Sequence, residues 1–149
     1  MTTRRIVTVF FGLTVAALAM ACGTEGSGGN GNTVTLGTSC FMFEAGKEGD
    51  FPTSGDCDLI LEPWCNGRPG LCGNWVQTAE TSLDAVATPP ASGYISDAAG
   101  FQDCQEIDSG KVIVFKLSNG KYAKGIFSAV SKDGNGCVTG AKFQYVYPM

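Results

Sequence analysis

Seven cysteines lie in a chain of 149 residues, and this odd number limits how the chain can be cross-linked. Cys22 comes first, and the other six are Cys40, Cys57, Cys65, Cys72, Cys104 and Cys137. Six cysteines can pair completely into three disulfides, each worth roughly 2–4 kcal/mol. The chain has no histidine and no two cysteines at C-x2-C spacing, so a zinc site is not favoured. We therefore expect a disulfide-stapled domain without a metal ion.

The N-terminal segment predicts export, which disulfide formation requires. Arg4 and Arg5 precede an uncharged apolar run over residues 6–18, and small residues follow it at 19 and 21. The run is shorter than the ~20 residues that a membrane-spanning helix needs. Residues 1–21 are therefore interpreted as a signal peptide that is removed.

The residues at the cleavage site leave two processing routes open. Leu18-Ala19-Met20-Ala21-Cys22 resembles the lipobox of bacterial lipoproteins, in which the cysteine thiol is acylated and becomes the first residue. This resemblance implies a membrane partner through diacylglycerol and palmitate on Cys22. Gly23 replaces the aspartate that retains some lipoproteins at the inner membrane, which favours the outer membrane. The alternative is an ordinary signal-peptidase site, which would give a secreted or periplasmic protein with a free Cys22 thiol.

Composition and charge change after the cleavage site. Residues 22–32 are rich in glycine, serine and asparagine, which predicts a flexible tether. Residues 33–149 have the length of one domain with its own core. Without Arg4 and Arg5 the chain keeps eight basic and 14 acidic residues, a net charge of −6. Such a chain repels polyanions, so nucleic acid is not an expected partner.

Short strand patterns separated by turn residues dominate the domain. Strands are expected over 33–36, 40–43, 57–62, 74–77 and 93–96, and loops over 47–55 and 97–110. Thr81 and Asp84 have the spacing of a capping box, which predicts a short helix stopped by Pro89 and Pro90.

The C-terminal part carries the clearest hairpin signal. Asn119-Gly120 separates strand patterns over 111–117 and 122–130, which is typical of a two-residue type I′ turn. That turn would pair Leu117 with Tyr122. It would also gather five side chains on one face of the hairpin: Ile113, Phe115, Leu117, Tyr122 and Ile126.

A further turn at 133–136 and an alternating strand at 141–147 complete a three-stranded meander, with Phe143, Tyr145 and Tyr147 on one face. Together these patterns predict an all-β fold, either a small antiparallel sandwich or a partly open barrel. The fold would contain one short helix and would be stapled by disulfides.

Residues 65–72 combine two turn dipeptides with a cysteine at each end, which favours a Cys65–Cys72 disulfide. The remaining cysteines would then form Cys40–Cys57 and Cys104–Cys137, one of three possible connectivities. Trp64, Arg68 and Trp75 lie in or beside this loop and are candidate binding residues, because Trp and Arg are enriched where binding energy concentrates. The alternative is that both indoles pack into the core or cover the disulfide.

A resemblance to a known family rests on two segments. Asn119-Gly120-Lys121-Tyr122-Ala123-Lys124 between two strands, with Asp58-Leu59-Ile60-Leu61 upstream, resembles the small β-rich lipoproteins of the HmuY type. The resemblance implies a lipid-anchored, all-β, surface-exposed protein whose founding relative binds heme. Heme in that family is held by histidine, which this chain lacks, and Met42 and Met149 are isolated in the sequence. We therefore expect no cofactor.

Three classes of function follow from these features. The first is a lipid-anchored binding module of the cell envelope, whose partner is a protein, a glycan or a small molecule. The second is a secreted protease inhibitor presenting a disulfide-clamped Arg68 loop. The third is a hydrolase using carboxylates among Asp56, Asp58, Glu62 and Glu106. No G-x-S-x-G motif, phosphate-binding loop or histidine base is present, so an enzyme is not expected.

Overall fold

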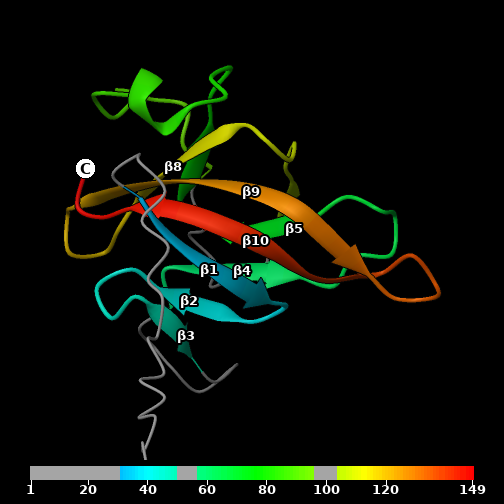
Figure 1. The fold of residues 1–149 in the computed structure, drawn as a ribbon. Helices are drawn as coiled ribbons and strands as arrows, with labels where there is room; N and C mark the ends of the chain where they lie inside the picture. Colours follow the sequence, from blue (N-terminus) through cyan, green and yellow to red (C-terminus); the bar gives the residue numbers. More distant parts are fainter. Residues whose placement is uncertain (1–30, 50–56, 96–103) are drawn as a thin grey trace, which may run out of the picture.

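The computed structural model describes residues 31–49, 57–95 and 104–149, which form two five-stranded antiparallel sheets (Figure 1). The strand order of the first sheet is β1 (Asn32–Gly37), β10 (Val138–Val146), β9 (Tyr122–Lys132), β8 (Val112–Lys116) and β6 (Trp75–Gln77). The strand order of the second sheet is β3 (Lys47–Gly49), β2 (Cys40–Met42), β4 (Leu59–Glu62), β5 (Gly70–Gly73) and β7 (Gln105–Glu106). The all-β prediction is confirmed. The sheets do not close on each other, so of the two predicted architectures the sandwich is the correct one.

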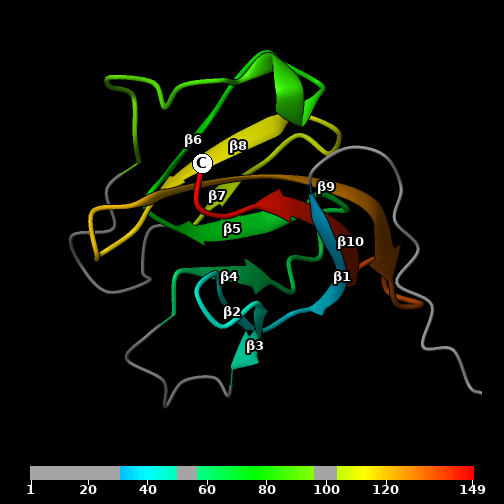
Figure 2. The ribbon, with the colours of Figure 1, turned by 60° about the vertical axis from the view of Figure 1, so that its left-hand side comes forward.

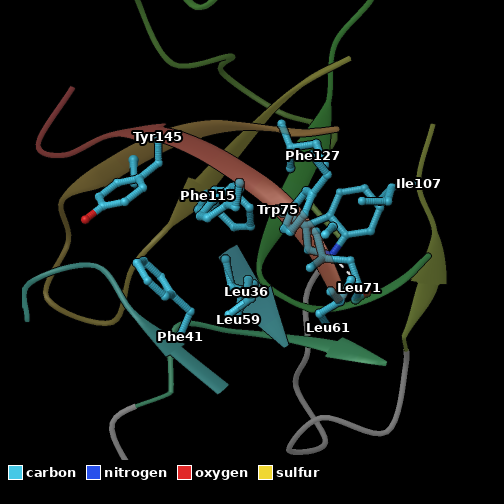
Figure 3. Packing of buried hydrophobic residues seen from close by; sticks show 14 of the residues in the cluster. Leu36, Phe41, Leu59, Leu61, Leu71, Trp75, Ile107, Phe115, Phe127 and Tyr145 are labelled. Atoms are coloured by element: carbon cyan, nitrogen blue, oxygen red, sulfur yellow. Dashed lines mark hydrogen bonds between the residues drawn. The ribbon is translucent and has the colours of Figure 1, made fainter. Parts of the chain in front are cut away.

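The main core lies between the two sheets, where side chains from both point toward one another (Figure 3). Phe41, Leu59 and Leu61 come from the second sheet, and Phe115 and Phe127 from the first; all five are fully buried. Alternation along the strands explains this arrangement, because every second residue faces the same side of a sheet.

The turn of the β8–β9 hairpin differs from the predicted one. The Leu117 N–H donates to the Lys121 carbonyl over 2.9 Å, and the Gly120 N–H donates to the Leu117 carbonyl over 3.0 Å. Gly120 has φ +79°, whereas Asn119 lacks the positive φ that a type I′ turn requires. The loop therefore has three residues, a type I turn followed by a left-handed glycine, rather than two.

This longer loop shifts the pairing by one residue, so that Lys116 lies opposite Tyr122. A shift of one residue moves each side chain of a strand to the other face of the sheet. Ala123 and Phe127 therefore face the main core, while Tyr122 and Ile126 pack on the outer face. The predicted common face is therefore correct for Ile113, Phe115 and Leu117, which all lie in the main core. It is wrong for Tyr122 and Ile126.

The predicted turn at 133–136 and the predicted aromatic face of the last strand are both present. The Asp133 N–H donates to the Cys137 carbonyl over 2.9 Å, which closes the predicted turn between β9 and β10. Phe143 and Tyr145 are buried in the main core, and Tyr147 packs against it. The meander and its aromatic face are therefore confirmed.

The part of the chain around η1 (Leu83–Ala85), within residues 78–95, covers part of the outer face of the first sheet (Figure 2). This helix is a single 3-10 turn, whose N-cap is Ser82 without a side-chain cap, so the predicted capping box is wrong. The Lys124 ammonium donates to the Leu83 and Val86 carbonyls, each over 2.8 Å. These bonds hold the turn on the sheet, since a cation satisfies carbonyls that a short helix leaves free.

Two expected loops and one expected strand differ from the structure. The loops expected over 47–55 and 97–110 contain the short strands β3 and β7, which two or three residues of pairing are enough to form. The strand expected over 93–96 is reduced, within the described part, to a single bridge between Ile95 and Trp75. Short strands of this kind are fixed by their neighbours and not by their own sequence pattern.

Three disulfides are present, as expected, but only one predicted pair is correct. The bonds join Cys40 to Cys57, Cys65 to Cys137, and Cys72 to Cys104. The predicted Cys65–Cys72 and Cys104–Cys137 pairs are wrong. The cause is the register of β4 and β5, in which Glu62 lies opposite Gly70 and Ile60 opposite Cys72. Cys72 is therefore inside a strand, whereas Cys65 lies in the loop beyond it.

The predicted signal peptide and Cys22 lie outside the described residues, as does most of the predicted tether. The described part begins at Gly31, and β1 starts at Asn32, one residue before the predicted domain boundary. None of the described residues belongs to a helix that is long and apolar enough to cross a membrane.

Candidate binding surface

Trp75 is a core residue and not a surface contact. It is 2% exposed, and its indole N–H donates to the Leu71 carbonyl over 3.1 Å. Figure 3 shows its ring among Leu71, Phe127 and Ile107. The alternative that this indole packs into the core is therefore correct, and Trp75 cannot contribute to a binding surface in the folded domain.

Trp64 lies on the other side of β5. Its half-buried indole covers Gly70, where an added Cβ would lie 2.6 Å from two of the ring carbons. Leu71, the next residue, points into the main core beside Trp75. Because successive residues of a strand face opposite sides, the sheet separates the two tryptophans that the sequence places on either side of one loop.

Arg68 is held by a network of polar side chains that we name the Arg68 cluster: Asn66, Arg68, Gln77, Glu106 and Asp108. The guanidinium forms ion pairs with Glu106, over 2.6 Å, and with Asp108. The Arg68 backbone N–H donates to the Asn66 side-chain carbonyl over 3.0 Å, which fixes the loop locally. The cluster connects the β4–β5 loop to the segment around β7.

Asp108 is bonded to Gln77 as well as to Arg68. The Gln77 side-chain N–H donates to it over 3.0 Å, and the Asp108 backbone N–H donates to the Gln77 side-chain oxygen over 2.7 Å. The hydrogen bond from Gln77, followed by that from Arg68, lowers the pKa of Asp108 below its ordinary value. A carboxyl with a lowered pKa stays ionised and cannot serve as a general acid near neutral pH.

This lowered pKa predicts a pH-dependent contribution to stability. A carboxyl with a lower pKa in the folded state stabilises the fold at neutral pH, and this stabilisation is lost as the pH falls below about 4. We expect Asp108→Asn to be less stable than the parent protein at pH 7, with the difference shrinking on acidification. Urea unfolding at several pH values measures it. Asp84→Asn, at an exposed aspartate outside the cluster, is the control, and equal acid slopes in parent and Asp108→Asn would contradict the prediction.

The cluster weakens the inhibitor hypothesis. The loop is not clamped by a Cys65–Cys72 disulfide, and the Arg68 guanidinium already binds two carboxylates. Insertion of Arg68 into a protease pocket would require both ion pairs to break, and Pro69 follows the arginine. A protease inhibitor is therefore not the function that this geometry favours.

The carboxylates proposed for hydrolysis have structural partners instead. Asp58 accepts the Phe43 backbone N–H over 2.8 Å, and Glu106 binds Asn66 and Arg68. Glu62 lies 3.5 Å from the Cys72 sulfur, and Asp56 is outside the described residues. Each of the three described carboxylates thus lies against another group of the protein.

Glu62, Cys72 and Cys104 are the one group in the described part whose donor atoms come close enough to suggest a metal site. Cys72 and Cys104 form a disulfide, however, and a metal requires the thiolate form. Met42 and Met149 do not meet either: they pack on the outer faces of different sheets. These residues therefore do not fit a metal ion or an axial ligand pair.

Trp64, Arg68 and, as a possible catalytic carboxylate, Glu106 were candidates from the sequence, whereas Gln77 and Asp108 were not. Arg68 and Asp108 are 40 residues apart in the chain, and the separation of Gln77 and Asp108 is 31. No local motif links them. The resulting surface includes a half-buried indole and an arginine that is paired with two carboxylates.

Comparison with known proteins defines the fold but not a family. No protein-family model matches the chain, and no curated protein does. Among solved structures, a provisionally assigned HmuY-like heme-binding protein from Bacteroides vulgatus is similar, with a TM-score of 0.55 and 14% identity over 80% of this chain and 93% of that one.

Two further structures have the same fold. A provisionally assigned lipoprotein from Bacteroides fragilis has a TM-score of 0.56 and 12% identity over 80% of this chain and 90% of that one. The apo HmuY analog of Tannerella forsythia has a TM-score of 0.51 and 13% identity over 77% of this chain and 94% of that one. The resemblance to HmuY-type proteins is thus confirmed, and at such identities it extends to the fold alone.

Proposed function

We propose that this protein is a lipid-anchored binding lipoprotein of the bacterial cell envelope, with the β-sandwich carried at the outer membrane on the tether of residues 22–32. Cysteine pairing is the observation that supports it best. The three disulfides use all six cysteines that follow Cys22. Cys22 therefore has no disulfide partner within its own chain, and it stands where a lipobox requires a cysteine.

The similar folds support the same proposal. One of the similar structures is assigned to a lipoprotein, and two are described as HmuY-like or as an HmuY analog. None of the descriptions names an enzyme, and the three described carboxylates considered for hydrolysis contact other protein groups. We infer a binding role at the surface around Trp64, whose half-buried indole covers Gly70, and the Arg68 cluster. Heme is not the proposed ligand, because the chain contains no histidine to ligate it.

Replacing Cys22 tests the anchor. Cys22→Ser removes the thiol that would be acylated, so we expect complete loss of metabolic palmitate labelling and release of the protein from membranes, since one or two acyl chains provide the attachment. The measurement is palmitate incorporation together with the intact mass of the purified protein. Parent protein with no acyl mass, or label retained in Cys22→Ser, would overturn the proposal.

Gly23→Asp is the matched control, because it changes the residue beside Cys22 without touching the thiol. It is expected to keep the label and the acyl mass. In a host that reads aspartate after the cysteine as a retention signal, it should move the protein from the outer to the inner membrane fraction. Loss of the label in this variant as well would show that the Cys22→Ser result reports processing in general and not acylation of Cys22.

A further inference from the structure

Three of the four sheet edges are short, charged or covered. At the β6 edge, the Ile95 N–H donates to the Trp75 carbonyl over 2.7 Å, so another segment of the chain already occupies it. β3 has three residues, including Lys47 and Glu48, and β7 has two, including Glu106. Short length and charge are the devices by which native edge strands avoid pairing with other chains.

The β1 edge has none of these protections between Asn32 and Leu36. β1 runs for six residues, Asn-Thr-Val-Thr-Leu-Gly, without a charge or a proline. Within the described ranges its one neighbour is β10, and the register between the two strands is regular along the whole of β1. Figures 1 and 2 both show β1 at the margin of the first sheet.

The backbone groups that β1 presents outward can be identified from its C-terminal end. The Gly37 N–H donates to the Glu48 carboxylate, and the Gly37 carbonyl accepts the Ser39 N–H over 2.9 Å. Both groups of Gly37 thus point away from β10. In an antiparallel pair, residues alternate between those bonded to the neighbour and those facing outward. Thr35 and Thr33 therefore carry outward N–H and carbonyl groups.

Side chains of β1 alternate in the same way. Thr33 and Thr35 are exposed on the outer face of the sheet, and Leu36 is fully buried. Val34 is packed against the main core but is only partly buried, because no strand lies beyond it in the described part of the chain. Among the residues that the structure describes, the edge thus combines unpaired backbone groups with an apolar side chain that a further strand would cover.

We propose that β1 pairs in antiparallel fashion with β1 of a second copy of this chain, about a two-fold axis at Val34. This register places Thr33 opposite Thr35 of the partner subunit and Val34 opposite Val34 of the partner subunit. The outward N–H and carbonyl groups of Thr33 and Thr35 then form hydrogen bonds with those of the partner subunit. The first sheets of the two copies thereby join into one continuous sheet.

Self-complementarity is what selects a second copy over an unrelated extended peptide. A two-fold axis requires the same surface to match itself, and β1 does so because its donors and acceptors alternate symmetrically about Val34. The strand has no charge to repel its copy, and directly opposed threonines are a favourable cross-strand pair. The two Val34 side chains meet at the margin of the core and cover each other.

Thr35→Pro tests the pairing in the full-length chain. Proline removes the outward N–H and is tolerated at an edge where that N–H faces solvent, so the bonds to β10 remain. We expect the parent to contain dimer at ~100 µM and Thr35→Pro to associate at least tenfold more weakly by native mass spectrometry. Thr35→Ser keeps the N–H and should dimerise like the parent. A monomeric parent, or equal dimerisation of Thr35→Pro, would overturn the proposal.

Cross-linking tests the register and does not depend on the stability of the proline variant. Val34→Cys should form a disulfide-linked dimer, because directly opposed non-hydrogen-bonded residues have their Cβ atoms within about 5 Å. Thr33→Cys should not link to itself, since its partner is Thr35, but should link to Thr35→Cys in a mixture. Dimers from Thr33→Cys alone, or capture of a different protein by Val34→Cys, would overturn the self-pairing.

Discussion

Phe143→Ala is expected to lower the free energy of unfolding by about 3–5 kcal/mol, the range for deleting a buried aromatic side chain. Phe143 is fully buried, stacks on Phe127 with the ring centroids 4.4 Å apart, and contacts Phe41 edge-on at 5.6 Å. Its ring also fills the space above Gly125, where a Cβ would collide with it. Because domains of this size are stable by only ~5–15 kcal/mol, the loss is a large part of the total.

Equilibrium unfolding in urea measures this loss, with the disulfides intact in both proteins. Lys142→Ala is the matched control, since Lys142 is the exposed neighbour of Phe143 and points to the opposite face of β10. It should change stability by less than about 0.5 kcal/mol. A Phe143→Ala protein as stable as the control would show that the aromatic cluster is not the centre of the core.

Removing the Cys65–Cys137 disulfide is expected to cost about 4 kcal/mol. The bond closes a loop of 72 residues, and the entropy that a cross-link removes from the unfolded chain grows with loop length. It joins the β4–β5 loop of one sheet to the β9–β10 turn of the other, beside the hydrogen bond from the Val138 N–H to the Trp64 carbonyl, 2.9 Å. Cys65→Ser/Cys137→Ser therefore frees the two sheets from a covalent link.

Reduction provides the control for this double variant. Cys65 is exposed and Cys137 is partly exposed, so serine in their place changes the packing little. The parent and the double variant should differ in the oxidised state and converge when all cysteines are reduced. A difference of the same size in the reduced proteins would mean that side-chain contacts, and not the cross-link, are responsible.

The core-facing strands were predictable because their patterns repeat over enough residues. β10 alternates Ala141, Phe143 and Tyr145 with polar residues, which fixes both its type and its buried face. β3 and β7, by contrast, contain Lys47-Glu48-Gly49 and Gln105-Glu106, which carry no strand signal. They are strands only because β2 and β5 offer them backbone partners.

The candidate surface was predictable only in part. Trp64 and Arg68 were candidates because they occur beside turn residues, but Asp108, which pairs with Arg68, and Gln77, which bonds Asp108, come from distant segments. Trp75 shares the sequence neighbourhood of Trp64 and yet lies on the opposite side of β5. The sequence around each residue does not predict these contacts, because they depend on how the chain folds between the distant segments.

By itself the sequence determined the all-β class, the C-terminal meander with its aromatic face, and the presence of six cysteines able to pair. These are properties of composition and of short-range periodicity, which each segment carries within itself. Only the tertiary structure decided which cysteines pair, because sulfurs bond according to distance in space. It also decided the face on which Tyr122 and Ile126 lie, since one additional loop residue in the β8–β9 turn moves each side chain of the strand to the other face of the sheet. Asn-Gly is compatible with both loop lengths, so the sequence alone does not distinguish them.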